Sequence, residues 1–192
     1  MSRQFWSETV AWATAAGTAV ASTASETILV PNTTIPANFL QDGRALRITA
    51  TGAYGTTATP TLIFRIRWGG VSGTVLATSS TATTTSGTGG GASMTALWTF
   101  EAIIQTRANG SSGSLFTNGQ AILYNSANPT SGTVTNYGLP MVLASGSTGG
   151  TTPVAVTADL TTDTALSFTG QWGTSNAANS IRCDQFLIEA LN

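Results

Sequence analysis

The sequence contains no histidine, no lysine and a single cysteine, Cys183, among its 192 residues. Charged residues make up 8 % of the chain, against roughly 25 % in an average soluble protein. Without histidine, a Ser-His-Asp triad, a Cys-His pair and a His-ligated metal site are excluded. One cysteine excludes an intramolecular disulfide and a zinc site made of cysteines alone. We therefore expect no cofactor, no metal and no enzymatic activity.

The seven basic residues are all arginines scattered along the chain, and the net charge is -1. Such a chain lacks a surface that neutralises phosphates, so nucleic acid is not an expected partner. No run reaches the ~18 apolar residues of a membrane helix, so no membrane partner is expected. The Ala-rich run 11–24 is interrupted by Thr14, Gly17, Thr18 and Ser22, unlike a secretory signal. We expect residues 1–24 to form an N-terminal arm or first strand, and residues 25–192 to form one domain.

Hydroxyl side chains are the most abundant feature, with 36 Thr and 19 Ser. Disordered chains of this polarity usually carry high net charge and few aromatic residues. This chain has almost no net charge, and it holds 5 Trp, 7 Phe and 3 Tyr. The composition therefore indicates a folded domain with a neutral, hydroxyl-rich surface.

Alternation of apolar and polar residues predicts β-strands throughout. It is clearest in residues 46–51, 64–68 and 166–172, each of which reads as a strand with one face on a core and one in water. Residues 92–107 also fit helical spacing, but no Ser-x-x-Glu cap precedes them and the neighbouring segments are strands, which favours a strand. Further strands are expected at residues 26–30, 73–78, 114–124, 139–143, 153–158 and 181–191. About ten strands separated by Gly- and Asn-rich turns predict a single antiparallel β-sandwich, of the jelly-roll type.

The carboxylates offer little chemistry. A glycosidase needs two of them facing each other across a cleft. Glu101 lies among apolar residues of a strand, and either faces solvent or pairs with an arginine across the sheet. Asp42, Asp159 and Asp163 read as turn residues that accept hydrogen bonds from their own downstream backbone. Cys183 reads as a small buried apolar group.

The tryptophans divide into two groups. Trp68, Trp98 and Trp172 lie on the apolar faces of their strands, where packing in the core explains them. Trp6 and Trp12 lie outside that pattern, near Phe5. We predict that Phe5, Trp6 and Trp12 anchor the N-terminal arm, either to the protein's own sheet or to a partner.

Three stretches together carry a resemblance to a known group of proteins: TIPANFLQDGRALRI at residues 34–48, the strand pair at residues 60–77, and SNAANSIRCDQFLIE at residues 175–189. In this order, a proline-bearing turn leads into a Gly-Arg-x-Leu-Arg-Ile strand, and an Asn/Ser-rich turn precedes a final apolar strand. The sequence from about residue 26 onward resembles the small jelly-roll virion proteins of tailed bacteriophages. That family has no catalytic residues, so none is transferred.

The resemblance implies a capsid decoration (cement) protein or a knob of a head or tail fibre, assembled in the host cytoplasm and displayed on the virion surface. It also implies a homotrimer that binds the major capsid protein or another virion protein. The first hypothesis is therefore a structural protein that binds and stabilises the assembled head shell through its N-terminal arm or one end of the barrel. The alternative is a receptor- or carbohydrate-binding knob, with Tyr124, Tyr137 and Asn136 as candidate contacts.

Overall fold

The computed structural model describes residues 7–56, 60–84, 94, 96–124, 138–147, 149 and 152–191. Throughout this part of the chain the regular elements are strands, in agreement with the all-β prediction, and no helix long and apolar enough to span a membrane is found there. The longer strands are β1 (Ser7–Trp12), β5 (Ala45–Gly55), β6 (Thr61–Trp68), β7 (Thr74–Ser79), β9 (Ala96–Ala108), β10 (Gly113–Tyr124), β11 (Gly138–Ser145), β13 (Thr164–Trp172) and β14 (Ser180–Leu191). The short strands are β2 (Val20–Ala21), β3 (Thr27–Ile28), β4 (Thr33–Ile35), β8 (Ala82–Thr83) and β12 (Val156–Ala158).

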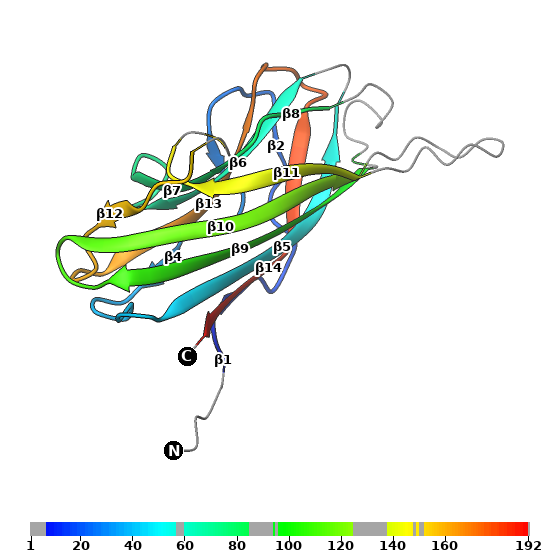
Figure 1. Cartoon of the computed structure of the whole chain (residues 1–192). Coiled ribbons are helices and arrows are strands. Elements are labelled where there is room, and N and C mark those ends of the chain that lie inside the picture. Colours follow the sequence, from blue (N-terminus) through cyan, green and yellow to red (C-terminus); the bar gives the residue numbers. More distant parts are fainter. Residues whose placement is uncertain are drawn as a thin grey trace.

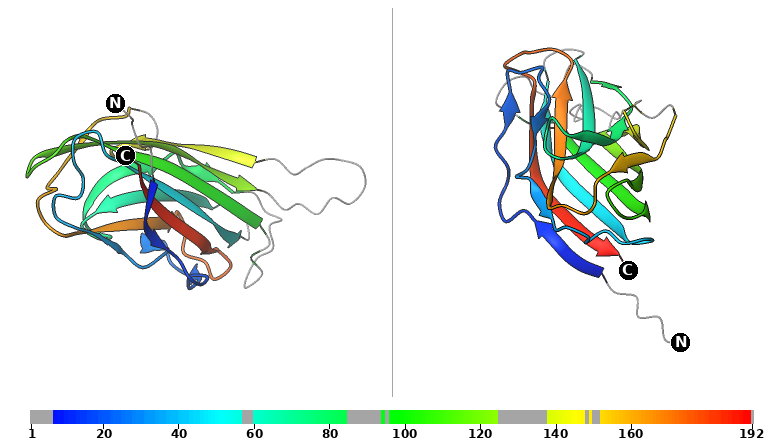
Figure 2. Two further views of the ribbon diagram at one scale, coloured as in Figure 1. Left: turned by 90° about the horizontal axis from the view of Figure 1, so that it is seen from below. Right: turned by 90° about the vertical axis from the view of Figure 1, so that its left-hand side faces the viewer.

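All strand pairs among the described residues are antiparallel. Ten strands follow one path that folds back on itself into two layers, and β2, β4, β8 and β12 pair with strands of this path from outside it. The path runs β1-β14-β5-β9-β10-β11-β7-β6-β13-β3. In Figure 1, β9 and β10 lie in front, with β6 and β13 behind them; Figure 2 shows the two layers from the side. β11 joins the layers, because it pairs with β10 over part of its length and with β7 at its end. On the opposite side of the sandwich the path of described strands ends at β1 in one layer and at β3 in the other.

Aromatic rings fill the space between the layers. Phe64 on β6 and Phe168 on β13 stack with their centroids 5.7 Å apart. Phe100 on β9 reaches Phe168 from the other layer at 4.5 Å, and Trp98 reaches Phe64 at 5.1 Å. Trp68, Trp98 and Trp172 are buried, which confirms their assignment to the core. The alternation read from the sequence is therefore the alternation between this core and solvent.

Gly52 permits the closest packing in this core. A Cβ at this position would lie 2.7 Å from the Trp98 ring and 2.0 Å from the carbonyl oxygen of Arg182. The register of β14 shifts beside it, between Cys183 and Gln185. The missing side chain lets the Trp98 indole lie against the backbone of β5, where its Nε1–H donates to the Arg182 carbonyl at 3.2 Å.

Of the finer predictions about the fold, one is confirmed and two are not. Residues 96–108 form a strand, as predicted over a helix. The described residues contain fourteen strands where about ten were expected, because pairs and triplets of residues such as β2 and β8 form short strands that alternation does not reveal. A jelly roll has two Greek keys, and this pairing order, in which β5 lies between β14 and β9, does not confirm that connectivity.

Candidate functional site

The N-terminal segment runs along the whole of β14 at the edge of the sheet. β1 pairs with Leu187–Leu191, and β2 pairs with Ser180–Ile181 at the other end of β14. Between them the Ala13 N–H donates to the Phe186 carbonyl at 2.9 Å, and the Gly17 N–H to the Cys183 carbonyl at 2.7 Å. Residues 7–21 therefore behave as a first strand. Of the three predicted anchors, Phe5 and Trp6 lie outside the described residues.

A second segment follows the edge of the other layer. β3 and β4 both pair with β13, and the Leu29 N–H between them donates to the Phe168 carbonyl at 3.0 Å. Residues 7–35 thus cover two edges in succession, first that of β14 and then that of β13. The space between these two passes of the chain is the open side of the sandwich.

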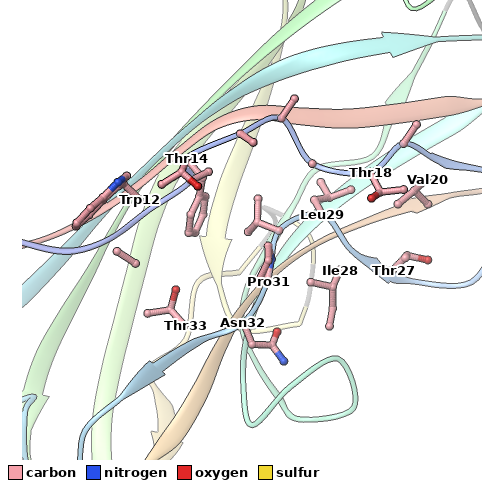
Figure 3. Close-up of a pocket in the computed structure, with 18 of the residues that line it drawn as sticks. Trp12, Thr14, Thr18, Val20, Thr27, Ile28, Leu29, Pro31, Asn32 and Thr33 are labelled. Carbon is pink, nitrogen blue, oxygen red and sulfur yellow. The ribbon is translucent and has the colours of Figure 1, made fainter.

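This open side holds a groove of about 1100 Å³. One wall is formed by residues 10–21 and the other by residues 27–34, and Phe186 of β14 contributes to its lining. Figure 3 shows Trp12, Thr14 and Thr18 on the first wall, with Asn32 and Thr33 on the second. Nearly all of the lining residues are small, apolar or hydroxyl-bearing, and none of them is charged.

Trp12 is the most exposed large apolar side chain among the described residues, at 63 %. It ends β1 and lies at the groove, beside Thr14 (Figure 3). Trp12 does not pack against the protein's own core, so its predicted role as an anchor to a partner stays a prediction. Burying an exposed indole against a partner gains free energy from its apolar area, and its N–H keeps a polar contact available. Trp12 is thus the described side chain in this groove best suited to meet a ligand.

The free edge of β1 is less suited to pairing with a further strand. The register of β1 against β14 shifts between Thr9 and Ala11, which marks a β-bulge at Val10. Bulges twist a strand and interrupt the regular row of donors and acceptors that another strand would need. The Trp12 side chain and the groove are therefore better suited to contact a partner than the strand edge is.

The second wall is fixed to the sheet by Glu26, which directly precedes β3. Its carboxylate accepts hydrogen bonds from Arg67 Nε and Nη2, both at 2.6 Å, from Arg65 Nη1 at 3.1 Å and from Thr169 Oγ1 at 2.6 Å. Arg65 also donates to Gln171, whose amide in turn donates to the Ala24 carbonyl. The Glu26 side chain is only 13 % exposed. These bonds hold residues 24–28 against β6 and β13.

The electrostatics of Glu26 follow from these contacts. Burial by itself raises the pKa of a carboxyl group. Here the hydrogen bonds from Arg67 and Thr169, together with the charges of Arg67 and Arg65, outweigh burial and lower the pKa of Glu26 below its ordinary value. The carboxylate is therefore held in its charged form as a structural group, and it is not available as a general acid.

The three aspartates predicted to be turn residues each accept a hydrogen bond from a backbone N–H, but two of them accept it from a distant segment. Asp159 accepts from the N–H and the hydroxyl of Thr161, at 2.8 and 2.6 Å, as expected for its own downstream backbone. These bonds lower the pKa of Asp159. Asp42 instead accepts from the Asn109 N–H at 2.7 Å, and Asp163 from the Ala37 N–H at 2.8 Å. Asp42 lies in a turn as predicted, but the expected bond to the downstream backbone was wrong for Asp42 and Asp163, because tertiary contacts bring distant backbone N–H groups to them.

The remaining sequence candidates are dispersed. Cys183 is buried, and burial followed by the charge of Asp184 raises the pKa of its thiol to about 12. Tyr124 is partly exposed at the end of β10, where its carbonyl accepts from the Tyr54 hydroxyl at 3.2 Å. Tyr137 and Asn136 lie outside the described residues. In the part of the chain that the structure covers, no group of three or more His, Cys, Asp or Glu side chains is placed to hold a metal ion.

A second, smaller hollow of about 310 Å³ lies on the outer face of β9 and β10. It is lined by Glu101, Ala102, Ile103, Asn118, Gly119 and Gln120. Sequence reasoning left open whether Glu101 faces solvent or pairs with an arginine. The structure places it exposed on this outer face, and within the described residues it has no hydrogen-bond or ion-pair partner.

Comparison with known proteins adds little to this geometry. No protein-family model matches the chain, and neither does any curated protein. One solved structure that resembles it is the CBM2 module of the evolved Dit of Lactobacillus casei BL23 phage J-1. The two chains are 12 % identical, and the match covers 84 % of this chain and 68 % of the other with a TM-score of 0.32. This likeness is too low to transfer a fold or a function.

Proposed function

We propose that this protein is a non-enzymatic structural protein of a bacteriophage virion, and that it attaches to its particle through the N-terminal segment and the groove beside it. Capsid decoration, in which the protein binds and stabilises the assembled head shell, is the specific role in this proposal. The phage assignment comes from the sequence resemblance. The resemblance also implies jelly-roll connectivity. That connectivity is part of the proposal, but the attachment site does not depend on it.

The observation that carries the attachment site is the exposure of Trp12 at the groove. A residue of this size is normally buried in a protein of this kind, as the other described tryptophans are. Phe5 and Trp6 precede Trp12 in the sequence by a few residues, so three aromatic side chains belong to one short stretch. Aromatic anchors surrounded by weaker contacts are typical of the energetically dominant part of an interface.

The uncharged lining of the groove supports a protein partner over a nucleic acid. A phosphate-bearing ligand needs cations to replace its counterions, and no charged residue lines the groove. A partner segment with small, apolar or hydroxyl-bearing side chains would match the alanines and threonines of both walls. A partner that offers this segment only in the assembled shell would be stabilised in that state by mass action.

The attachment proposal is tested on intact particles. Antibody labelling in electron microscopy is expected to find the protein on the virion surface, on the head. Particles assembled without the protein are then mixed with purified chain, and binding is measured by co-sedimentation. Trp12→Ala and a variant lacking residues 1–6 are each expected to weaken binding by about tenfold or more, the loss of an aromatic hot spot.

Val154→Ala is the matched control, because Val154 is an exposed apolar residue that does not line the groove. It is expected to bind as the unchanged protein does. Absence of the label from purified particles would refute the virion role. Undiminished binding by both N-terminal variants would refute the attachment site while leaving the virion role intact. The homotrimer that accompanies this proposal is counted by mass photometry.

A carbohydrate-binding knob is the second candidate, and the same tryptophan favours it. The groove combines an exposed indole with hydroxyl groups and the Asn32 amide on its opposite wall, and so offers the stacking platform and hydrogen-bonding groups that a sugar ring requires. A glycan array probed with the full chain and with Trp12→Ala separates the candidates. Signals that disappear in the variant support sugar binding, whereas an array without signals rejects it.

A further inference from the structure

Most of the exposed large apolar side chains lie on one face of the sandwich. Seven such residues occur among the described positions, and four of them point outward from β9, β10 and β11: Leu97, Ile103, Tyr124 and Val142. Leu97 and Val142 are the most exposed of these, at 61 % and 57 %. The other three are Trp12, Val154 and Leu139, which has the inward register of Met141 and Leu143 on β11. This outer face is the one seen at the front of Figure 1.

Strand register brings these side chains together. On β9 the outward positions alternate with the core residues Trp98, Phe100 and Ala102. Gln120, which faces outward on β10, lies opposite Glu101 on one side and Val142 on the other. Ile122 lies likewise between Thr99 and Pro140. The face is thus a continuous mixture of aliphatic, amide and hydroxyl groups, whereas the solvent face of an antiparallel sheet is ordinarily polar.

Two opposite charges on this face lack ion-pair partners within the described residues. They are Glu101 and Arg107, both outward on β9. Arg107 lies over the ring of Phe116 on β10, 3.9 Å from its centroid, which keeps the guanidinium on the face. Arg47, which lies opposite Ile103 on the neighbouring strand β5, is directed to Glu189, which it approaches at 3.7 Å. Six residues of extended strand separate Glu101 from Arg107 by about 20 Å, too far for the two to pair within one molecule.

We propose that the outer face of β9, β10 and β11 is the surface by which copies of this chain bind one another, with Glu101 of one copy paired to Arg107 of the next. Since the same face carries both charges, two copies that face each other about a two-fold axis form both pairs at once, and this contact is distinct from the three-fold contact of a homotrimer. The hollow of about 310 Å³ beside Glu101 gives room for a side chain of the neighbouring copy. This contact is separate from the groove at Trp12 and does not depend on the proposed virion role.

The size of the face fits such a contact. From Leu97 to Arg107 the strand β9 extends about 34 Å, and the three strands β9, β10 and β11 are about 14 Å wide. The face therefore offers about 490 Å² per copy, or about 980 Å² for a pair, which is the size of a weak, transient protein contact. A contact of this size dissociates on dilution, so the oligomer is expected to be concentration-dependent.

A charge-swap experiment tests this interface. The mass of the full chain is measured by sedimentation over a wide range of concentration, for the unchanged protein and for Glu101→Arg, Arg107→Glu and the double variant. Each single variant places like charges together and is expected to raise the dissociation constant of the oligomer about tenfold or more. The double variant restores opposite charges and is expected to return it to within about threefold.

Apolar contacts are tested separately. Leu97→Glu is expected to leave the chain monomeric, while the matched control Val154→Glu, an equally drastic change outside the face, assembles as the unchanged protein does. Circular dichroism and thermal unfolding confirm that each variant is folded. A monomeric unchanged protein at every concentration, single charge variants that assemble normally, or a double variant without recovery would each overturn the interface. Particle binding by Trp12→Ala is read independently, so failure of one proposal is not mistaken for failure of the other.

Discussion

On the outer face of β6 and β13, Arg65 and Arg67 are paired with Glu26 in a cluster with little exposure to solvent, whereas on the outer face of β9 Glu101 and Arg107 have no ion-pair partner among the described residues. The two faces carry similar alternating strands with charged residues pointing outward. The difference is that residues 24–35 cover one face's edge and supply its counter-charge, while nothing within the described chain covers the other. On the first face, folding itself pairs the charges with one another. On the second face the charges are not paired within the molecule, so they are available to a partner.

The largest effect is expected where the two layers share a core. Phe168→Ala removes a ring that contacts Phe64, Phe100, Trp98 and Phe186. Because both layers pack on it, the free energy of unfolding is expected to fall by about 4 kcal/mol, the usual cost of a buried Phe→Ala cavity. Urea unfolding followed by tryptophan fluorescence measures this loss. A fall of less than about 1 kcal/mol would mean that the two layers do not depend on a common core.

Removing one charge from each face sharpens the comparison directly. Glu26→Gln leaves Arg65 and Arg67 largely buried without a counter-charge, and is expected to lower the free energy of unfolding by about 2 kcal/mol. Glu101→Gln, the same change on the other face, is expected to alter it by less than about 0.5 kcal/mol in the dilute, dissociated protein. Chemical denaturation of both variants at neutral pH gives the two values. Equal losses would remove the distinction drawn between the faces.

Acid is expected to weaken the covered face through Glu26. Since folding lowers the pKa of Glu26, its contribution to stability is fully present above the unfolded pKa of about 4.3 and is lost as the pH falls through the folded value. The free energy of unfolding should therefore fall more between about pH 5 and about pH 3 in the unchanged protein than in Glu26→Gln. Asp159 contributes an acid-dependent loss to both proteins, so the difference between the two denaturation series isolates Glu26. Parallel curves would show that Glu26 is not the responsible group.

Much of the fold could be predicted because its signals are local. Alternation in segments such as residues 64–68 depends only on the period of a strand, and so identified the core faces of Trp68, Trp98 and Trp172 correctly. It also placed residues 96–108 in a strand. Very short strands escaped, since β2 and β8 are too brief to alternate and exist only because a neighbouring strand pairs with them.

The candidate site depends on contacts that no local pattern contains. Glu26 meets Arg65 and Arg67 across 39 and 41 residues of sequence, and Asp163 caps Ala37 across 126. The groove arises because residues 10–21 and 27–34 follow edges of two different layers. Trp12 was recognisable as an unusual tryptophan from its position outside the apolar pattern, but the groove beside it was not.

The sequence by itself determined that this protein lacks histidine chemistry, that its charged residues are sparse, and that it folds as strands that alternate around an apolar core. These properties follow from the composition and from the two-residue period of the sequence, and neither of them depends on contacts between distant residues. Only the tertiary structure decided which charges are paired, which edges are covered and which apolar side chains stay exposed. Those outcomes depend on contacts between residues that are far apart in the chain. An arginine or glutamate therefore has a different role according to whether folding places an oppositely charged side chain beside it.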